Sequence, residues 1–193
     1  MKIAGRSVEP GSVIAANEAI STDKNSRMAL RLSGGQSLRI NSSSRLRVHT
    51  ANHMSLDTGA IYFDTAYAQN TKPIVVTTPL GTAQDIGTQF QVKMTASKMV
   101  VGVRKGMVEV ATAGQPGLSI DKGHFVELDQ AGQHAAKPLE KDDPGWDWIE
   151  TVAPDFDIEG ATLEAYLEWY SNERALDLSW ADSESEKKAK KTV

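Results

Sequence analysis

The sequence predicts a mainly β protein: a sandwich- or solenoid-like stack of short, mostly antiparallel strands, with a small C-terminal β-α-β segment. From residue 14 to residue 126, apolar and polar residues alternate over short stretches separated by Gly, Ser, Asn or Asp, which is typical of half-buried strands. Nothing in this region has the length and the 3.6-residue period of a helix. Because no crossover helix is expected, neighbouring strands should pair locally and run mostly antiparallel.

The predicted strands are short, and tight turns join them. Residues 33–35 and 41–44 are rich in Gly, Ser and Asn and are expected to be turns. Strands are expected at residues 28–32, 37–40, 45–48, 60–63, 73–78, 89–94, 98–103, 107–111, 117–120 and 125–128.

A change of composition divides the chain. Residues 131–145 are mostly polar and contain Pro138 and Pro144, whereas all four tryptophans lie between Trp146 and Trp180. We therefore expect an all-β domain at residues 1–130, a linker at 131–145 and a separate segment at 146–193.

The C-terminal segment is expected to form the β-α-β unit. Strands are predicted at residues 156–159 and 176–180, on either side of a helix at 162–174 that Thr162 would cap. One face of this helix is apolar, because its side chains recur at helical spacing: Leu163, Tyr166, Leu167 and Tyr170. Such a unit is too small to stand alone, so we expect the chain to be a fragment whose remaining strands would follow Val193.

The tail at residues 182–193 has acidic residues before basic ones, an order that suits the dipole of a further helix.

Composition argues against several classes of function. The formal charge of −4 disfavours a nucleic-acid partner, and the absence of cysteine excludes a disulfide framework and a thiol nucleophile. No apolar run is long enough to span a bilayer, and the first residues do not form a secretion signal. No serine lies in a nucleophile elbow, and no glycine-rich loop leads from a strand into a helix. We expect neither catalysis nor a cofactor.

Two clusters of polar residues suggest chemistry at first sight. His49, His53 and Asp57 are four residues apart, as in a helical metal site, but their surroundings alternate like strands, so no metal is expected. Asp142, Asp143 and Asp147 adjoin Trp146 and Trp148, a combination found in glycoside hydrolases. Sequence neighbours rarely face each other across a sugar, and a solvated acidic linker with tryptophan anchors is favoured.

The most specific pattern is a series of three segments: TPLGTAQDIGTQFQV at residues 78–92, VRKGMVEV at 103–110 and DKGHFV at 121–126. The series resembles the FecR family, named for the ferric citrate regulator of bacterial cell-surface signalling. Residues 30–40 and 59–64 also match the pattern, so the resemblance covers roughly residues 11–128.

The residues of this motif are interpreted as determinants of the fold. Three glycines permit positive φ or close backbone approach at corners, and four apolar side chains would point to one strand face. A structural role is also favoured for the Gly-Thr pair. The motif residues are Gly81, Gly87, Thr88, Phe90, Val92, Gly106, Val108 and Val110.

The C-terminal segment is similar to the first half of the short N-terminal domain of secretins and TonB-dependent receptors. Residues 156–160, the helix at 162–174 and the strand at 176–180 fit that half. The glycine usual between helix and strand is absent, because Arg174 and Ala175 stand there.

The FecR resemblance implies the periplasmic part of a bacterial inner-membrane regulator. Such a regulator restrains a sigma factor through a cytoplasmic region and is membrane-bound through a helix; both would precede Met1. The implied partner is the signalling domain of a TonB-dependent receptor, which can be met by edge-to-edge strand addition. The candidate surface comprises Trp169, Leu176, Leu178 and Trp180. The alternative is a cell-envelope carbohydrate-binding or scaffold domain of the same β architecture.

Overall fold

The computed structural model describes residues 2–3, 6–7, 9–65, 72–133, 135–140 and 143–191. The chain forms two compact units, Met1–Val152 and Ala153–Val193, which are considered separately below. The first unit is built from strands and the second from short helices, so the prediction of a mainly β protein is confirmed. Among the described residues, no helix has the length and apolar character needed to cross a membrane.

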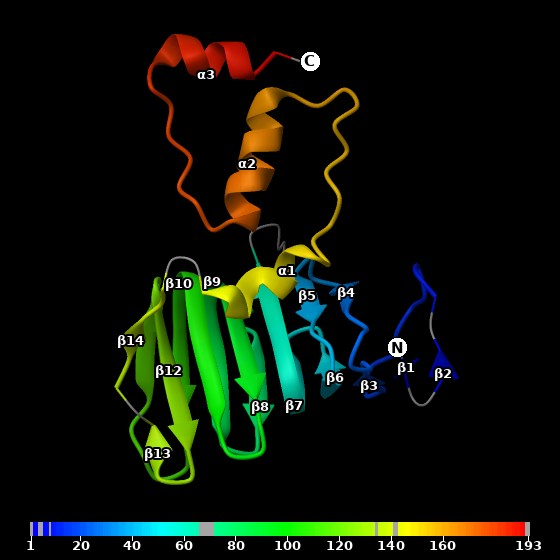
Figure 1. Ribbon diagram of the computed structural model, residues 1–193, viewed down its shortest axis with the longest axis vertical. Coiled ribbons are helices and arrows are strands. Elements are labelled where there is room, and N and C mark those ends of the chain that lie inside the picture. Colours follow the sequence, from blue (N-terminus) through cyan, green and yellow to red (C-terminus); the bar gives the residue numbers. More distant parts are fainter. Residues whose placement is uncertain are drawn as a thin grey trace. The chain divides into compact units, whose positions relative to one another are not determined.

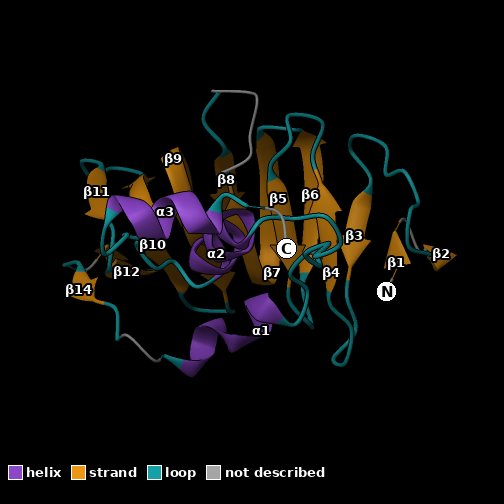
Figure 2. Ribbon diagram, turned by 90° about the horizontal axis from the view of Figure 1, so that it is seen from above, coloured by secondary structure: helices purple, strands orange, loops and turns teal. Residues whose placement is uncertain are grey.

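Among the described residues, one fourteen-stranded sheet makes up most of the first unit, and its order is β13-β12-β10-β9-β8-β7-β6-β3-β1-β2. Figure 2 shows this sheet from above, with the labels from β10 to β2 following in that order. The pairings between the described strands are antiparallel except for that of β7 with β8. The strands are β1 Lys2–Ile3, β2 Arg6–Ser7, β3 Ala19–Ser21, β4 Met28–Arg31, β5 Ser37–Ile40, β6 Arg45–Thr50, β7 His53–Asp64, β8 Val75–Thr78, β9 Gly81–Met94, β10 Met99–Ala111, β11 Leu118–Asp121, β12 His124–Asp129, β13 Gly132–Gln133 and β14 Lys137–Pro138.

Three long strands, β7, β9 and β10, organise this sheet and run side by side in Figure 1. Each changes neighbours half-way along: β7 pairs first with β6 and then with β5, and β10 pairs first with β12 and then with β11. Each also contains one glycine at positive φ, namely Gly59, Gly87 or Gly106. The sequence predicted residues 98–103 and 107–111 as separate strands, whereas the structure joins them as β10.

The register of the buried side chains changes at each of these glycines. In β7, the residues that face the core are even-numbered before Gly59 and odd-numbered after it. In β9 and β10, they are odd-numbered before the positive-φ glycine and even-numbered after it. An extra residue at the corner keeps the apolar side of both halves on one core, because a shift by one residue exchanges the faces of a strand. The residues are Met54, Leu56, Ile61 and Phe63 in β7, Ala83, Phe90, Val92 and Met94 in β9, and Met99, Val101, Val103, Val108 and Val110 in β10.

A short helical segment completes the first unit. The 3₁₀ turn η1 (Pro144–Trp146) leads into α1 (Asp147–Glu150), and the unit ends at Val152. Trp146 and Trp148 therefore belong to this first unit, called the β unit below, although they were expected in the C-terminal segment.

The second unit contains α2 (Leu163–Glu173) and α3 (Ser183–Ala189). The helix expected at residues 162–174 is confirmed, with the Thr162 hydroxyl accepting a 3.1 Å hydrogen bond from the amide of Ala165. The tail helix is present too, capped by Asp182. The strands expected at residues 156–159 and 176–180 are wrong. Their alternation marks amphipathic segments, but a strand also needs a neighbour to bond, and the described part of this unit offers none.

Candidate interaction surface and the FecR motif

Gly106 of β10 lies beside the bend that β9 makes at Gly87. Its φ is +77°, and a Cβ at this position would lie 2.4 Å from the carbonyl oxygen of Gly87 and 2.7 Å from the Thr88 methyl group. Gly87 has a φ of +71° with open space around it. The two glycines thus act differently, because Gly106 is needed for both conformation and space and Gly87 for conformation alone.

Asp85 stabilises the same corner and was not singled out in the sequence. Its carboxylate is buried and accepts hydrogen bonds from the amide of Ile74 and from the amide of Gly87, the latter at 3.2 Å. The Thr88 hydroxyl donates to the same carboxylate at 3.2 Å. The Thr88 amide in turn donates to the Thr65 hydroxyl at 2.9 Å. The only signal in the sequence was that an acidic residue stands at a strand position whose side chain faces inward.

The remaining motif residues lie inside the β unit. Gly81 approaches the backbone of the neighbouring strand so closely that a Cβ would lie 2.5 Å from the Ala111 carbonyl oxygen. Phe90 stacks on Phe63 with ring centroids 5.1 Å apart. Four apolar side chains have no exposed surface: Phe90, Val92, Val108 and Val110. These motif residues thus form backbone corners and core contacts.

Trp146 packs on the outer face of the sheet. Its ring meets Tyr62 edge-on at 6.3 Å, and the Arg104 guanidinium lies 4.5 Å from the ring centroid. Gly102 leaves room for the ring, because a Cβ there would lie 2.7 Å from it. A second arginine, Arg39, is fully buried and donates a 3.1 Å hydrogen bond to the Ile149 carbonyl oxygen.

This packing decides against a sugar site at the tryptophans. Trp146 and Trp148 are 4% and 7% exposed, so neither presents a free ring face for stacking. Asp143 accepts a 2.8 Å hydrogen bond from the Gly145 amide and thereby caps η1, while Asp147 is exposed. Asp142 lies outside the described residues. The expected tryptophan anchors are present, and they contact the β unit.

His49 and His53 lie on adjacent strands, not on one helix, with ring centroids 4.9 Å apart. His49 contacts the side chains of Asn17 and Ser55, and His53 contacts the Thr77 hydroxyl at 3.2 Å. Within the described ranges, no group of three His, Cys, Asp or Glu residues is arranged to hold a metal.

The predicted partner surface lies in the second unit. Leu176 and Leu178 are 49% and 38% exposed, in a segment without regular structure. Trp169 is half-buried and packs against Phe156 and Tyr166, with centroids 5.5 and 5.8 Å away. Trp180 is also half-buried. The two leucines are thus accessible to a partner, whereas Trp169 belongs to an aromatic cluster that holds α2.

The comparisons with known proteins address the β unit. Residues 18–109 match the family model described as "FecR protein". This part of the chain belongs to the FecR family. The matched region contains Gly59, Gly87 and Gly106, so the FecR match includes the bends of β7, β9 and β10. Among curated proteins, no sequence matches the chain.

The fold of the chain is also similar to that of solved structures. Two crystal structures of proteins from Parabacteroides distasonis, both assigned as anti-sigma factors, match with a TM-score of 0.57 each. The first is 20% identical, and the match covers 66% of this chain and 63% of that one. The second is 16% identical, with 80% and 74% covered. The chain therefore spans less than two thirds of the first structure, and the likeness establishes the fold.

Proposed function

We propose that this chain is the periplasmic, signal-receiving part of a FecR-like regulator that controls an extracytoplasmic-function sigma factor. In this role it binds the signalling domain of an outer-membrane TonB-dependent receptor. The FecR match at residues 18–109 supports the proposal, as does the assignment of two structural neighbours as anti-sigma factors. The contact with the sigma factor, and the attachment to the inner membrane, are assigned to regions outside this chain.

The observation that carries the receptor contact is the distribution of exposed apolar side chains. Among the described residues, five of the seven large hydrophobic side chains that are exposed belong to the second unit. Exposed apolar groups that gather in a small unit are typical of a surface that a partner covers. The five are Ile158, Leu163, Tyr170, Leu176 and Leu178.

The segment Leu176–Trp180 suits strand addition. It alternates apolar with polar residues but pairs with no strand within the described chain. A strand from the receptor domain would supply the missing neighbour, so that backbone hydrogen bonds give affinity and the exposed leucines give specificity.

The proposal is tested by titrating the chain with purified signalling domains of TonB-dependent receptors from the same genome. One domain should bind, and L176D/L178D should weaken its binding at least tenfold, because two carboxylates would have to be desolvated in an apolar contact. The matched control is I86D, which alters an exposed apolar side chain of the β unit and should bind like the parent.

If none of the domains binds, or if L176D/L178D binds unchanged, the receptor contact is refuted at this surface. Retention of the chain on peptidoglycan or on a glycan array, together with a negative titration, would instead favour the scaffold or carbohydrate-binding role.

A further inference from the structure

Strand β4 forms an edge of the sheet. Within the described chain it pairs with β5 alone. The Leu32 amide donates to the Gln36 carbonyl at 2.9 Å, which fixes where the hydrogen-bonded pairs fall in this hairpin. Because such pairs alternate along an antiparallel ladder, the even-numbered residues of β4 bond to β5. The backbone N–H and C=O groups of Ala29 and Arg31 therefore point outward, away from β5.

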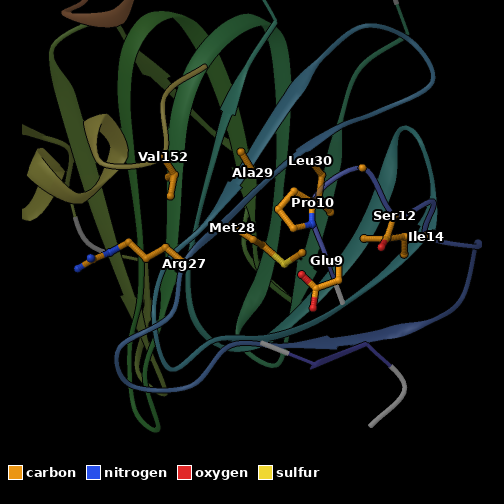
Figure 3. A pocket seen from close by; sticks show the side chains of 10 residues that line it. Glu9, Pro10, Ser12, Ile14, Arg27, Met28, Ala29, Leu30 and Val152 are labelled. Atoms are coloured by element: carbon orange, nitrogen blue, oxygen red, sulfur yellow. The ribbon is translucent and has the colours of Figure 1, made fainter. Parts of the chain in front are cut away.

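Two cavities follow this free edge. One has a volume of about 330 Å³ and lies between β4 and residues 9–14, with Val152 in its wall (Figure 3). The other, of about 540 Å³, continues past Ala29 to Ser33. Residues 9–18, which lie beside these cavities, do not pair with the edge of β4. Their described backbone hydrogen bonds join residues of the same segment or go to Val48. Space is therefore available next to the outward-pointing groups of β4.

The inner side of this space is apolar. Ile14, Leu30, Val48 and Ala51 line the larger cavity and are only partly buried at the margin of the core. An apolar side chain placed here would complete the core at its open edge. The residues of an added strand that share a face with Met28 and Leu30 are therefore expected to be apolar.

The face of β4 that carries the odd-numbered side chains is positively charged. Arg31 is exposed and, being odd-numbered like Ala29, projects from the opposite face of the strand. Arg27 is exposed immediately before the strand, and its Nε donates a 2.8 Å hydrogen bond to the side-chain oxygen of Asn41. Residues of an added strand on this face would lie opposite or diagonal to the two guanidinium groups, where carboxylates are favoured.

We propose that the outer edge of β4 binds an extended peptide strand of a partner protein in which acidic residues alternate with apolar ones. The backbone groups of Ala29 and Arg31 pair with it, its apolar side chains enter the cavities, and its carboxylates face Arg27 and Arg31. The inference rests on the β unit alone and is independent of the receptor contact proposed for the second unit.

The test uses the full chain and an eight-residue synthetic peptide that alternates glutamate with isoleucine or valine. Binding should slow amide exchange of Ala29 and Arg31 at least tenfold. A29P removes only an outward N–H, a change that edge strands accept, and should weaken peptide binding at least tenfold. R31E should do the same, whereas R45E, an equal charge change at an exposed position of β6, should leave binding unchanged.

A peptide with lysine in place of each glutamate is the matched ligand control and should bind at least tenfold more weakly. Absence of binding by the acidic peptide to a parent chain with an intact thermal transition would overturn the proposal. So would equal binding to A29P or R31E. Self-association of the chain that A29P abolishes would assign this edge to a second copy and would likewise overturn it.

Discussion

The indole Nε1 of Trp148 donates a 3.0 Å hydrogen bond to the side-chain oxygen of Gln91 in β9, and the bond is buried. It joins the short helix α1 to the outer face of the sheet. Together with the packing of Trp146 on Tyr62, it makes residues 144–152 a structural part of the β unit.

Trp148→Phe should lower the free energy of unfolding of the β unit by about 1–3 kcal/mol, because it leaves the buried Gln91 oxygen without its donor. Urea unfolding followed by circular dichroism measures the loss. Trp180→Phe is the control, since Trp180 lies in the other unit. An equal loss in both variants, or none in Trp148→Phe, would contradict the anchoring role of this bond.

Alanine substitutions should separate the roles of the corner glycines. Gly106→Ala should cost more than Gly87→Ala, for which we expect about 1–2 kcal/mol from the positive φ alone. The added methyl group of Gly106→Ala also meets the Gly87 carbonyl. Gly117→Ala is the control, because its Cβ would make only an ordinary contact at 3.8 Å. Thermal unfolding ranks the stability of the three variants. If Gly87→Ala were the most destabilising, the different roles assigned to Gly87 and Gly106 would be refuted.

Asp85→Asn should destabilise the β unit by about 1–3 kcal/mol. One carboxylate oxygen accepts from the Ile74 amide, and the other accepts from the Gly87 amide and the Thr88 hydroxyl. Asparagine has only one oxygen, and its amide nitrogen cannot accept the bonds that the second oxygen receives. Asp57→Asn makes the same chemical change at an exposed position of β7 and should have almost no effect. Equal urea midpoints for the two variants would show that the buried network does not stabilise the corner.

The cap of α3 should depend on pH. The backbone amide of Ser185, and then its hydroxyl, bond to Asp182 and lower the pKa of this carboxyl. A carboxyl with a lowered pKa stabilises the folded form above its unfolded pKa, and that contribution is lost as the pH falls through the folded value. Below that range, the protection factor of the Ser185 amide against hydrogen exchange should fall.

Asp182→Asn isolates this effect, because asparagine caps a helix without titrating. Glu184 and Glu186 titrate in both proteins, so the difference between parent and variant in an NMR pH series is the relevant quantity. If the Ser185 amide shows the same transition at acid pH in Asp182→Asn, the transition arises from a group other than Asp182.

The alternation of residues predicted most strands of the β unit because each half-strand buries one face. It did not predict that residues 98–103 and 107–111 are one strand. In the sequence Gly106 looks like an interruption, whereas in the fold it turns the strand and the pairing with β9 continues past it. The contribution of Asp85 was equally hidden, because its partner Ile74 belongs to another strand segment and is brought near by β8.

The C-terminal segment shows the opposite error. Residues 176–180 alternate like a strand, yet the described part of their unit contains no strand to pair with. A periodic pattern reports which side of a segment is apolar, and only the rest of the fold, or a partner, determines whether it becomes a strand. Leu176 and Leu178 in this segment are exposed.

The most direct test of the proposed role is transcription from a sigma-dependent promoter in the bacterium of origin, with the full-length gene carrying L176D/L178D. We expect the variant to accumulate normally but to lose the response to the receptor's inducing ligand, while I86D responds like the parent. A full response from L176D/L178D at normal protein level would contradict the claim that the second unit receives the signal.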